Sequence, residues 1–237
     1  MAQKCNFFIK IQVDFFHPFC YNGIEKQILY HIVVTKGYFI MKQMDFTNCR
    51  VVPVMVIQKL EDTIPTLEAL RDGGVPVAEI TFRTACAADA IRAGVEAFPD
   101  MMIGAGTVIN AKQAKEAIKA GAKFIVSPGL SVEVAGYCEA CDIPYLPGCV
   151  TPTEIMQALS LGLTTLKFFP ANVYGGLQAI KALSAPFPQI RFLPTGGVDL
   201  SNICEFLACD KIAAVGGSFM MKGDIRANCK KLLETIG

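Results

Sequence analysis

The sequence predicts an α/β protein, a closed (β/α)8 TIM barrel that forms a single domain and follows an N-terminal extension. Three observations favour this fold. Short apolar runs recur eight times after residue 50, and their starts lie 21 to 26 residues apart, which leaves room for one helix between strands. The runs are continuously apolar, as is typical of parallel strands covered by helices. No dinucleotide-binding fingerprint accompanies them, so a closed barrel is favoured over a doubly wound open sheet.

The expected strands are the apolar runs themselves. In chain order they span residues 51–57, 77–82, 101–105, 123–127, 144–146, 165–169, 190–193 and 212–215. This part of the chain is compact for eight strand and helix units, so we expect the connections between them to be short.

Helix signals stand between these strands. The stretch "TIPTLEALRDGG" starts with Thr63 and stops at Gly73. In "NAKQAKEAIKAGA", Asn110 is the expected N-cap, because its side chain can accept from a free N–H of the first turn. Thr151 and Glu154 lie three residues apart and predict a capping box at the start of a further helix.

The composition changes near residue 50. Residues 1–50 hold ten of the 22 aromatic residues and carry six Lys or Arg against three Asp or Glu, without a clear helix or strand period. We therefore divide the chain into an atypical aromatic-rich extension, 1–44, and a barrel domain, 45–237. The extension is interpreted as outside the functional protein, with Met41 and Met44 as plausible alternative starts. An accessory element packed on the barrel, and an aromatic patch for a membrane or a partner, are the alternatives.

Composition also excludes classes of function. The net charge is +1 and no basic stripe is visible, which argues against nucleic acid as a partner. The chain has no convincing signal peptide and no uncharged apolar run of 18 residues, so we expect a cytoplasmic protein that does not span a membrane. Its ten cysteines are then expected to be free thiols. Cys138 and Cys141 form a lone C-x-x-C, for which a structural role is favoured over zinc or redox chemistry.

The absence of histidine after residue 50 limits the chemistry of the barrel. A histidine-based triad and a histidine-ligated metal are excluded there, so proton transfer must use a carboxylate, lysine, tyrosine or water. Alternation along "VPVAEITFRT" directs Glu79 and Arg83 to the barrel interior. Glu79 is the one acid placed there at the functional end of a strand, although a satisfied interior carboxylate is an equal alternative. The third strand ends in "GAGT", where glycines allow backbone to approach a ligand before Thr107.

Two glycine pairs mark the last two strands. Gly196 and Gly197 follow the seventh strand, and Gly216 and Gly217 end the eighth, directly before Ser218. Exposed backbone N–H groups and a following helix N-terminus attract anions, and this end of a barrel is a frequent phosphate site. The pattern predicts a phosphate cradle to which the Ser218 hydroxyl adds a donor.

Lys167 lies in the sixth expected strand, within "TTLKFFP", where a buried unpaired charge is costly. Phe168, Phe169 and the packed interior disfavour the ammonium form, and Arg83 acts in the same direction. A neutral amine here is a nucleophile that attacks carbonyls to form a Schiff base. The structural alternative is a lysine in an ion pair with Glu79 or one that reaches solvent, and the residues alone leave both open.

A family resemblance now becomes clear. The motifs that carry it, in order along the chain, are "VPVMVI", "EITFRT", "GAGTV", "IVSPGL", "PGCVTPTE", "LKFFPA", "RFLPTGGV" and "VGGSFM". Together they resemble the class I aldolases of 2-keto-3-deoxy-6-phosphogluconate (KDPG), which also act on 4-hydroxy-2-oxoglutarate (KHG). The resemblance covers residues 51–222. Phe219 departs from it, because many members have tryptophan there, and this change is expected only to repack the rim of the site.

The resemblance implies a homotrimeric barrel that cleaves a small 2-keto acid, usually phosphorylated, through a lysine imine, with no metal and no other cofactor. The KDPG products are pyruvate and glyceraldehyde 3-phosphate, and the KHG products are pyruvate and glyoxylate. By position, Lys167 matches the Schiff-base lysine and Glu79 the acid/base. The implied substrate-binding residues are Arg83 and Thr107 at the pyruvate carboxylate, Pro128, Thr195, and the phosphate group Gly196, Gly197, Gly216, Gly217 and Ser218.

Other functions remain open at this stage. An aldolase for the galactonate epimer, 2-keto-3-deoxy-6-phosphogalactonate, would share the same residues. A phosphate-binding epimerase, isomerase or synthase would keep the glycines of the last two strands but would not need the lysine at position 167. A non-catalytic phosphosugar-binding barrel would also keep the cradle, so activity alone separates it from an enzyme.

Overall fold

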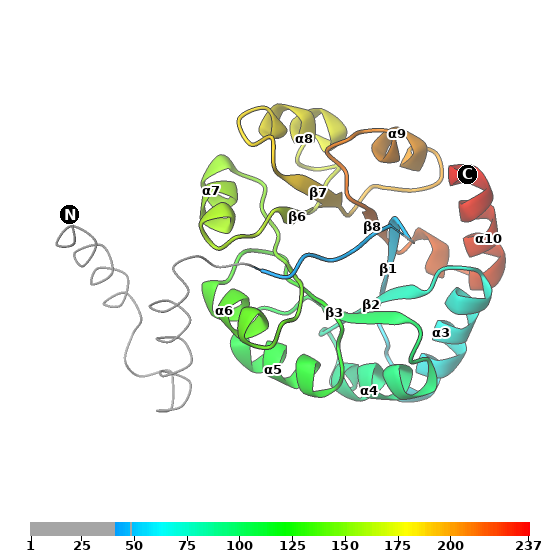
Figure 1. Cartoon of the computed structure of the whole chain (residues 1–237). Helices are drawn as coiled ribbons and strands as arrows, with labels where there is room; N and C mark the ends of the chain where they lie inside the picture. Colours follow the sequence, from blue (N-terminus) through cyan, green and yellow to red (C-terminus); the bar gives the residue numbers. More distant parts are fainter. Residues whose placement is uncertain (1–40, 48) are drawn as a thin grey trace, which may run out of the picture. The chain divides into compact units, whose positions relative to one another are not determined.

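The computed structural model describes residues 41–47 and 49–237 of the chain. One compact unit comprises Met41–Gly237. Figure 1 shows this unit as a ring of helices around a core of strands. Residues 1–40 lie outside the described residues, so the division of the chain at residue 44 stays a prediction.

Each of the eight expected runs overlaps a strand of the structure. The strands are β1 (Val51–Met55), β2 (Val77–Thr81), β3 (Met102–Gly106), β4 (Ile125–Val126), β5 (Tyr145–Leu146), β6 (Thr165–Phe168), β7 (Arg191–Pro194) and β8 (Val215–Gly217). The largest shift is in β8, which begins where the backbone pairs with β1, at Val51 opposite Val215. Gly216 and Gly217 continue this pairing, so both lie inside the last strand and are buried.

The strand pairs are all parallel, which confirms the predicted α/β class. Six strands form one sheet in the order β5-β4-β3-β2-β1-β8, and β6 and β7 form a second sheet. Isolated parallel bridges link the two sheets on both sides, from Gly148 to Lys167 on one side, and from Phe192 to Ile212 and Thr195 to Gly216 on the other. The strands are buried almost throughout, as expected for parallel strands that have a packed interior on one side and helices on the other.

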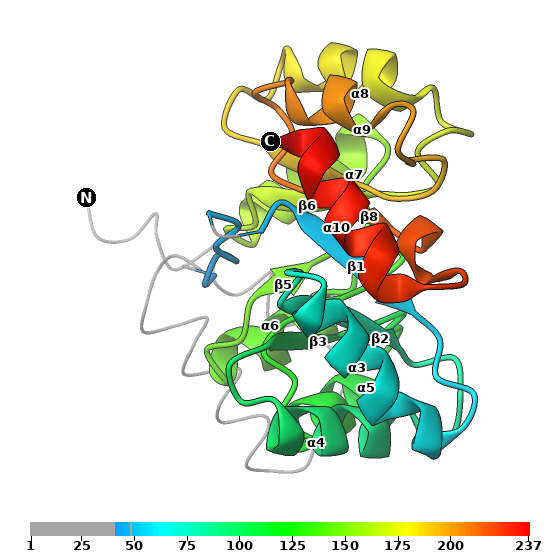
Figure 2. The ribbon, with the colours of Figure 1, turned by 90° about the vertical axis from the view of Figure 1, so that its right-hand side faces the viewer.

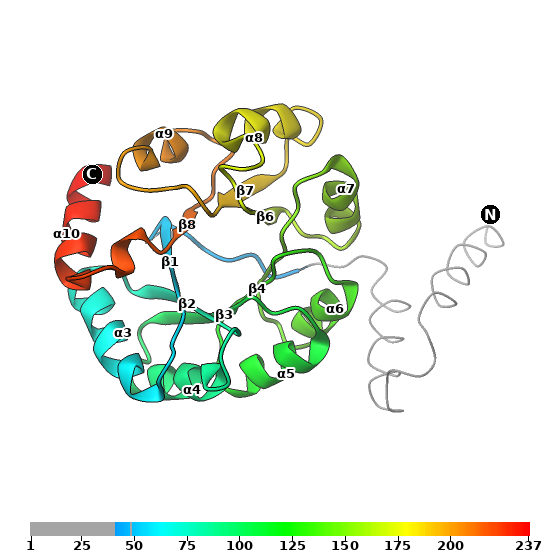
Figure 3. The same cartoon turned by 180° about the vertical axis from the view of Figure 1, so that it is seen from behind.

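Helices cover the strands on the outside, as Figures 1 and 3 show from opposite ends. They are α3 (Thr63–Asp72), α4 (Ala87–Ala97), α5 (Ala111–Lys119), α6 (Val132–Ala140), α7 (Pro152–Ser160), α8 (Gly176–Ser184), α9 (Ile203–Leu207) and α10 (Ile225–Ile236), with short 3-10 turns η1 (Leu60–Asp62) and η2 (Phe219–Met221). The expected caps are confirmed. Asn110 accepts from the N–H of Gln113, and Thr151 and Glu154 form a capping box.

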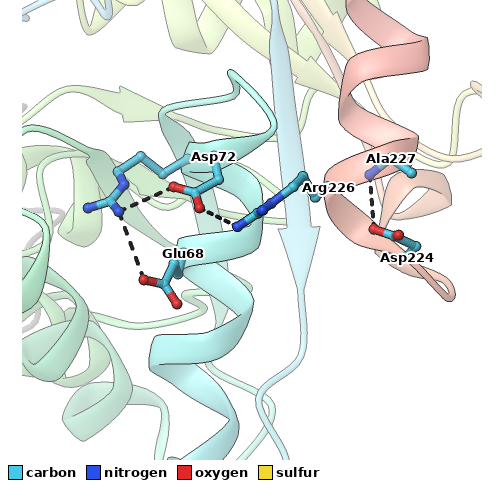
Figure 4. A network of polar contacts seen from close by, with 6 residues as sticks. Glu68, Asp72, Asp224, Arg226 and Ala227 are labelled. Carbon is cyan, nitrogen blue, oxygen red and sulfur yellow. Dashed lines mark hydrogen bonds and ion pairs between the residues drawn. The ribbon is translucent and has the colours of Figure 1, made fainter.

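The last helix meets the first helix of the ring. In Figure 2, α10 runs between α9 and α3, and it contacts both. Arg226 of α10 donates to Asp72 of α3, and Arg71 donates to the same carboxylate at 3.2 Å and lies 4.0 Å from Glu68 (Figure 4). Asp224 caps α10 by accepting from the N–H of Ala227. These partly exposed ion pairs add little energy individually, but they link the two ends of the helix ring.

A short lead-in precedes β1 and belongs to the same unit. Met41, Met44 and Phe46 are buried. Met44 and Phe46 join a core cluster with residues of the strands, among them Val77 and Phe124. In Figure 1 this blue segment runs across the ring to the start of β1. The lead-in therefore adds apolar side chains to the core formed by the strands.

Among the described residues, no helix combines the length and the apolar character that crossing a membrane requires.

We predict that a chain beginning at Met41 folds and turns over substrate as the full chain does. The reason is that the buried side chains of the lead-in are kept while the segment of unusual composition is removed. Thermal melting and steady-state rates of the two chains measure this.

A chain beginning at Thr47 is the matched control, because it lacks Met41, Met44 and Phe46. Loss of a buried side chain of this size costs about 2–5 kcal/mol, so this chain should melt at a clearly lower temperature. If the chain beginning at Met41 lost most of its activity or its melting transition, the removed segment would be part of the functional domain.

Candidate active site

A pocket of about 370 Å³ opens where the strands end. Nine of the eleven site residues predicted from the sequence line it, and the remaining two, Glu79 and Gly216, are buried beside it. The predicted residues that line it are Arg83, Thr107, Pro128, Lys167, Thr195, Gly196, Gly197, Gly217 and Ser218. Contributions thus come from the ends of β2, β3, β4, β6, β7 and β8, which is where a parallel barrel builds its sites.

A buried ion pair lies at the wall of this pocket. The Nζ atom of Lys167 is 3.2 Å from Oε1 of Glu79, and the exposed fractions of the two side chains are 8% and 1%. The second carboxylate oxygen, Oε2, is buried and receives no hydrogen bond from any described residue. An unsatisfied buried carboxylate oxygen is unfavourable unless another group binds to it. The pair therefore combines an amine that reaches the pocket with a carboxylate that has a free acceptor.

Gly106 makes room for this carboxylate. It is the last residue of β3, next to β2, and a Cβ placed on it would fall on the Glu79 carboxylate. In the same strand, a Cβ at Gly104 would meet the ring of Phe124. The sequence predicted that the glycines of "GAGT" let backbone approach a ligand. This interpretation was wrong for Gly104 and Gly106, because what approaches them is a side chain of the same protein.

The two phenylalanines that follow Lys167 have different surroundings. Phe169 lines the pocket, and the Lys167 Nζ atom lies 5.6 Å from the centre of its ring. Phe168 is fully buried and packs edge-on against Phe192 and Tyr174. Both rings were expected to disfavour the ammonium form, but the Phe168 side chain points to the opposite face of the strand from the amine, as alternation requires.

Arg83 and Thr107 form a second polar group in the pocket. The Arg83 Nε atom donates to the Thr107 hydroxyl at 3.1 Å. This contact leaves the terminal nitrogens of the guanidinium without an ion-pair partner in the described part of the chain, in the fork geometry that suits a carboxylate. Thr107 has a φ angle of 56°, which is unusual for a β-branched residue. Such a conformation costs about 1–3 kcal/mol and often marks a functional site.

The glycines of β7 and β8 differ in their roles. Gly196 and Gly197 follow β7 with φ angles of 89° and 78°, a left-handed backbone that favours glycine. Gly216 instead provides space for the hydroxyl of Thr195, which is buried and without a partner among the described residues. The helix N-terminus that follows Ser218 is that of the 3-10 helix η2, which has only three residues. After Gly197 the chain first makes a turn at Asp199, so α9 begins several residues later.

Comparison with known proteins decides the family. The family model described as KDPG and KHG aldolase matches residues 42–234. The chain belongs to this family.

Individual members of the KDPG and KHG aldolase family are similar to the chain in sequence and in structure. The KHG/KDPG aldolase of Escherichia coli (strain K12) is 44% identical over 178 residues, which cover 75% of this chain and 84% of that protein. The 2-dehydro-3-deoxy-phosphogluconate aldolase of Treponema pallidum (strain Nichols) is 43% identical over 172 residues, covering 73% and 82%. The structure of the Legionella pneumophila KDPG aldolase, with pyruvate captured as a covalent carbinolamine intermediate, matches with 40% identity and a TM-score of 0.74, covering 81% and 94%. The chain is an aldolase, a carbon–carbon lyase.

The sequence did not single out every residue that lines the aldolase pocket. The residues not singled out are Val54, Val198, Asp199 and Lys222, whereas Phe169 and Phe219, which the sequence placed beside the amine and at the rim, also line the pocket. Two of the residues not singled out are charged. Asp199 follows the glycine pair of β7 by two residues, and Lys222 follows Ser218 by four. Their closeness to predicted strand ends could have marked Asp199 and Lys222 as candidates. Neither residue lies in a strand, so alternation could not predict where its side chain points.

None of the cysteines in the described part of the aldolase lines this pocket. Cys138 is buried and Cys141 is exposed, and both are free thiols. Burial raises the pKa of the Cys138 thiol, which makes it less reactive. Within the described ranges, no group of three or more His, Cys, Asp and Glu side chains is arranged to hold a metal ion.

We predict that Gly106→Ala displaces Glu79 from Lys167, because the new methyl group would occupy the space of the carboxylate. Loss of a positioned acid/base typically costs about 100-fold or more in rate, so kcat for aldol cleavage should fall by at least that factor. Thermal melting should show a smaller effect, about 1–3 kcal/mol from overpacking.

Gly136→Ala is the matched control, since a Cβ there meets no atom within 4 Å. It should leave kcat unchanged. Full activity of Gly106→Ala would mean that the position of the Glu79 carboxylate does not matter for cleavage.

Proposed function

We propose that this aldolase cleaves KDPG to pyruvate and glyceraldehyde 3-phosphate, and KHG to pyruvate and glyoxylate, through a Schiff base on Lys167. The observation that carries the proposal is the buried pair in which Lys167 Nζ lies 3.2 Å from Glu79 Oε1 at the pocket. An ion pair alone also fits a structural role. The pocket favours a catalytic role, because the Lys167 amine lines it together with the Arg83 guanidinium group and the glycines that follow β7.

Glu79 is placed to prepare the nucleophile. Lys167 must lose a proton before it can attack a ketone, and the Glu79 oxygen lies within reach to accept it. The amine then adds to the substrate carbonyl at C2 and gives a carbinolamine. Glu79 returns the proton to the carbinolamine hydroxyl, which leaves as water, and an iminium ion remains.

The iminium ion is the electron sink for cleavage. Glu79, again a carboxylate, takes the proton of the C4 hydroxyl through a water, the C3–C4 bond breaks, and its electrons form the enamine of pyruvate. The aldehyde leaves with C4 as its carbonyl carbon. Glu79 then supplies the proton that C3 of the enamine needs, and hydrolysis of the resulting imine frees pyruvate and Lys167. The Glu79 carboxylate thus accepts a proton in some steps and donates one in others, which is general acid–base catalysis by one side chain.

The two ends of the substrate fit the two ends of the pocket. Arg83 is held at Nε by Thr107, so its terminal nitrogens are free for a bidentate contact with the pyruvate carboxylate. Pro128 forms the wall between this end and the next strand, where its carbonyl lies against Gly148. At the other end, Thr195 and the backbone of Gly196 and Gly197 are assigned to the distal end of the substrate. The phosphate belongs beside Ser218, whose hydroxyl has no partner among the described residues.

The proposal includes a closed eight-stranded barrel and a cytoplasmic homotrimer. Support for closure comes from the two seams between the sheets. The N–H of Cys149 donates to Lys167 at 2.9 Å, and the N–H of Ala213 donates to Phe192 at 2.9 Å. Large exposed apolar side chains offer surface for contacts between copies. They include Ile109, Met156, Val173 and Tyr174.

We predict that pyruvate and borohydride together inactivate the enzyme and add mass to the peptide that contains Lys167. The reduction traps the imine, so labelling requires an amine that reaches the substrate carbonyl. Lys167→Met should abolish both labelling and cleavage, with a loss of several orders of magnitude in rate. Peptide mass spectrometry and a coupled pyruvate assay measure the two effects.

Glu79→Gln is the informative companion variant, because it keeps the shape of the side chain but cannot accept a proton. It should still form the imine, more slowly, while cleavage fails. A label on another lysine would overturn the assignment of Lys167. Loss of activity with a chelator would instead favour a metal-assisted aldolase.

We also predict that Ser218→Ala raises KM for KDPG about tenfold, which is the loss of about 1.4 kcal/mol expected for one hydrogen bond to a charged group. KM for KHG should stay unchanged, because that substrate has no phosphate. A bulky residue at Gly197 should act in the same direction. It also strains a backbone with φ of 78° and meets Asn172, so its melting temperature must be measured as well.

Ser160→Ala, on the exposed side of α7, is the control for Ser218→Ala. It should change neither constant. Equal losses on KDPG and KHG in Ser218→Ala would indicate a role in folding and argue against the phosphate assignment.

A further inference from the structure

Lys222 lines the same pocket as Ser218 but takes no part in the chemistry described above. It follows the turn η2, which begins directly after Ser218. Its side chain is exposed, and no described acidic residue or carbonyl accepts from its ammonium group. By contrast, Lys123 and Lys211, elsewhere in the described chain, use their ammonium groups on backbone carbonyls. Lys222 is thus a cation of the pocket wall that remains available to a ligand.

The backbone of this lysine is held in place although its side chain is not. Asn228 of α10 donates through Nδ2 to the carbonyl oxygens of Lys222, at 2.6 Å, and Met220, at 3.1 Å. Gly223 then turns the chain with a φ angle of 69°, and Asp224 caps α10. A fixed backbone limits the positions that the ammonium group can take, which lowers the entropic cost of using it for binding.

The charge at this end of the pocket needs a cation. Asp199 lines the same pocket, and hydrogen bonds from the hydroxyl and the N–H of Ser201 lower the pKa of its carboxyl group. Asp199 is therefore ionised at neutral pH and repels an anion placed between β7 and β8. Backbone N–H groups and the Ser218 hydroxyl are neutral donors and do not cancel this charge. Lys222 lines the same pocket and supplies the opposite charge.

We propose that Lys222 is a specificity residue that makes the aldolase prefer substrates whose distal end carries a dianionic phosphate over unphosphorylated 2-keto acids. This inference rests on the proposed function, because it names the group that distinguishes KDPG from KHG in the same pocket. Lys222 acts on binding of the phosphate and not on the bond-breaking steps, which belong to Lys167 and Glu79.

The test compares kcat/KM for KDPG and for KHG in the full chain and in Lys222→Gln. An exposed ammonium beside a phosphate contributes about three- to tenfold in affinity. Lys222→Gln should lose that factor on KDPG and less than about twofold on KHG. Lys222→Arg should keep most of the preference, and Lys222→Glu should lose more than the glutamine variant. Added salt should weaken KDPG turnover of the unaltered enzyme more than that of Lys222→Gln.

Lys230→Gln is the matched control, since Lys230 is an exposed lysine on α10 that does not line the pocket. It should behave as the unaltered enzyme. Equal losses on both substrates in Lys222→Gln, or no loss on KDPG, would overturn the inference.

Calorimetric binding of inorganic phosphate separates this inference from the proposed function. Weaker phosphate binding in Lys222→Gln than in Lys230→Gln supports the role of Lys222, whether or not the enzyme cleaves KDPG or KHG. Failure to cleave either substrate would contradict the proposed function but not the role of Lys222. Equal phosphate affinity in the two variants would overturn the role of Lys222 even in a chain that cleaves KDPG.

Discussion

The contact between Lys167 and Glu79 constrains more of this structure than any other. Removing two charges from water is costly, and the cost is offset only if the partners meet with good geometry. Their 3.2 Å separation joins β2 and β6, two strands that are not neighbours in the sheets, across the interior of the molecule. Gly106 in β3 must lack a side chain for the carboxylate to fit. The relative placement of three strands is therefore tied to one pair of atoms, and the Oε2 oxygen of Glu79 has no hydrogen-bond partner among the described residues.

Around this pair, the proposed function assigns two kinds of recognition to the pocket. Arg83 and Thr107 at the ends of β2 and β3 are assigned to a carboxylate, and Ser218, Lys222 and the left-handed glycines after β7 to the distal end of the substrate. The Lys167 amine lines the same pocket. A ligand anchored at both ends places its ketone against Lys167, which turns binding energy into orientation of the reacting carbon.

Much of the fold and of the site followed from local patterns. The strand period, the cap at Asn110 and the capping box at Thr151 depend on residues close in sequence, and the structure bears them out. Nine of eleven predicted site residues line one pocket because, in a parallel barrel, all strands end on the same side. The predictions failed where the partner of a residue is distant in the chain. Gly104 and Gly106 accommodate Phe124 and Glu79, Phe168 packs away from the amine, and Ser218 precedes only the three-residue 3-10 helix η2 and no α-helix.

The sequence by itself determined the order of strands and helices, the absence of histidine after residue 50, and the lysine, carboxylate and arginine that we propose for the chemistry. These features are properties of residue type and short-range spacing. Only the tertiary structure decided that the lysine and the carboxylate form a buried pair, that Gly216 makes room for Thr195, and that Asp199 and Lys222 belong to the pocket. Each of those depends on segments brought together by strand register and by packing, which a local pattern does not specify.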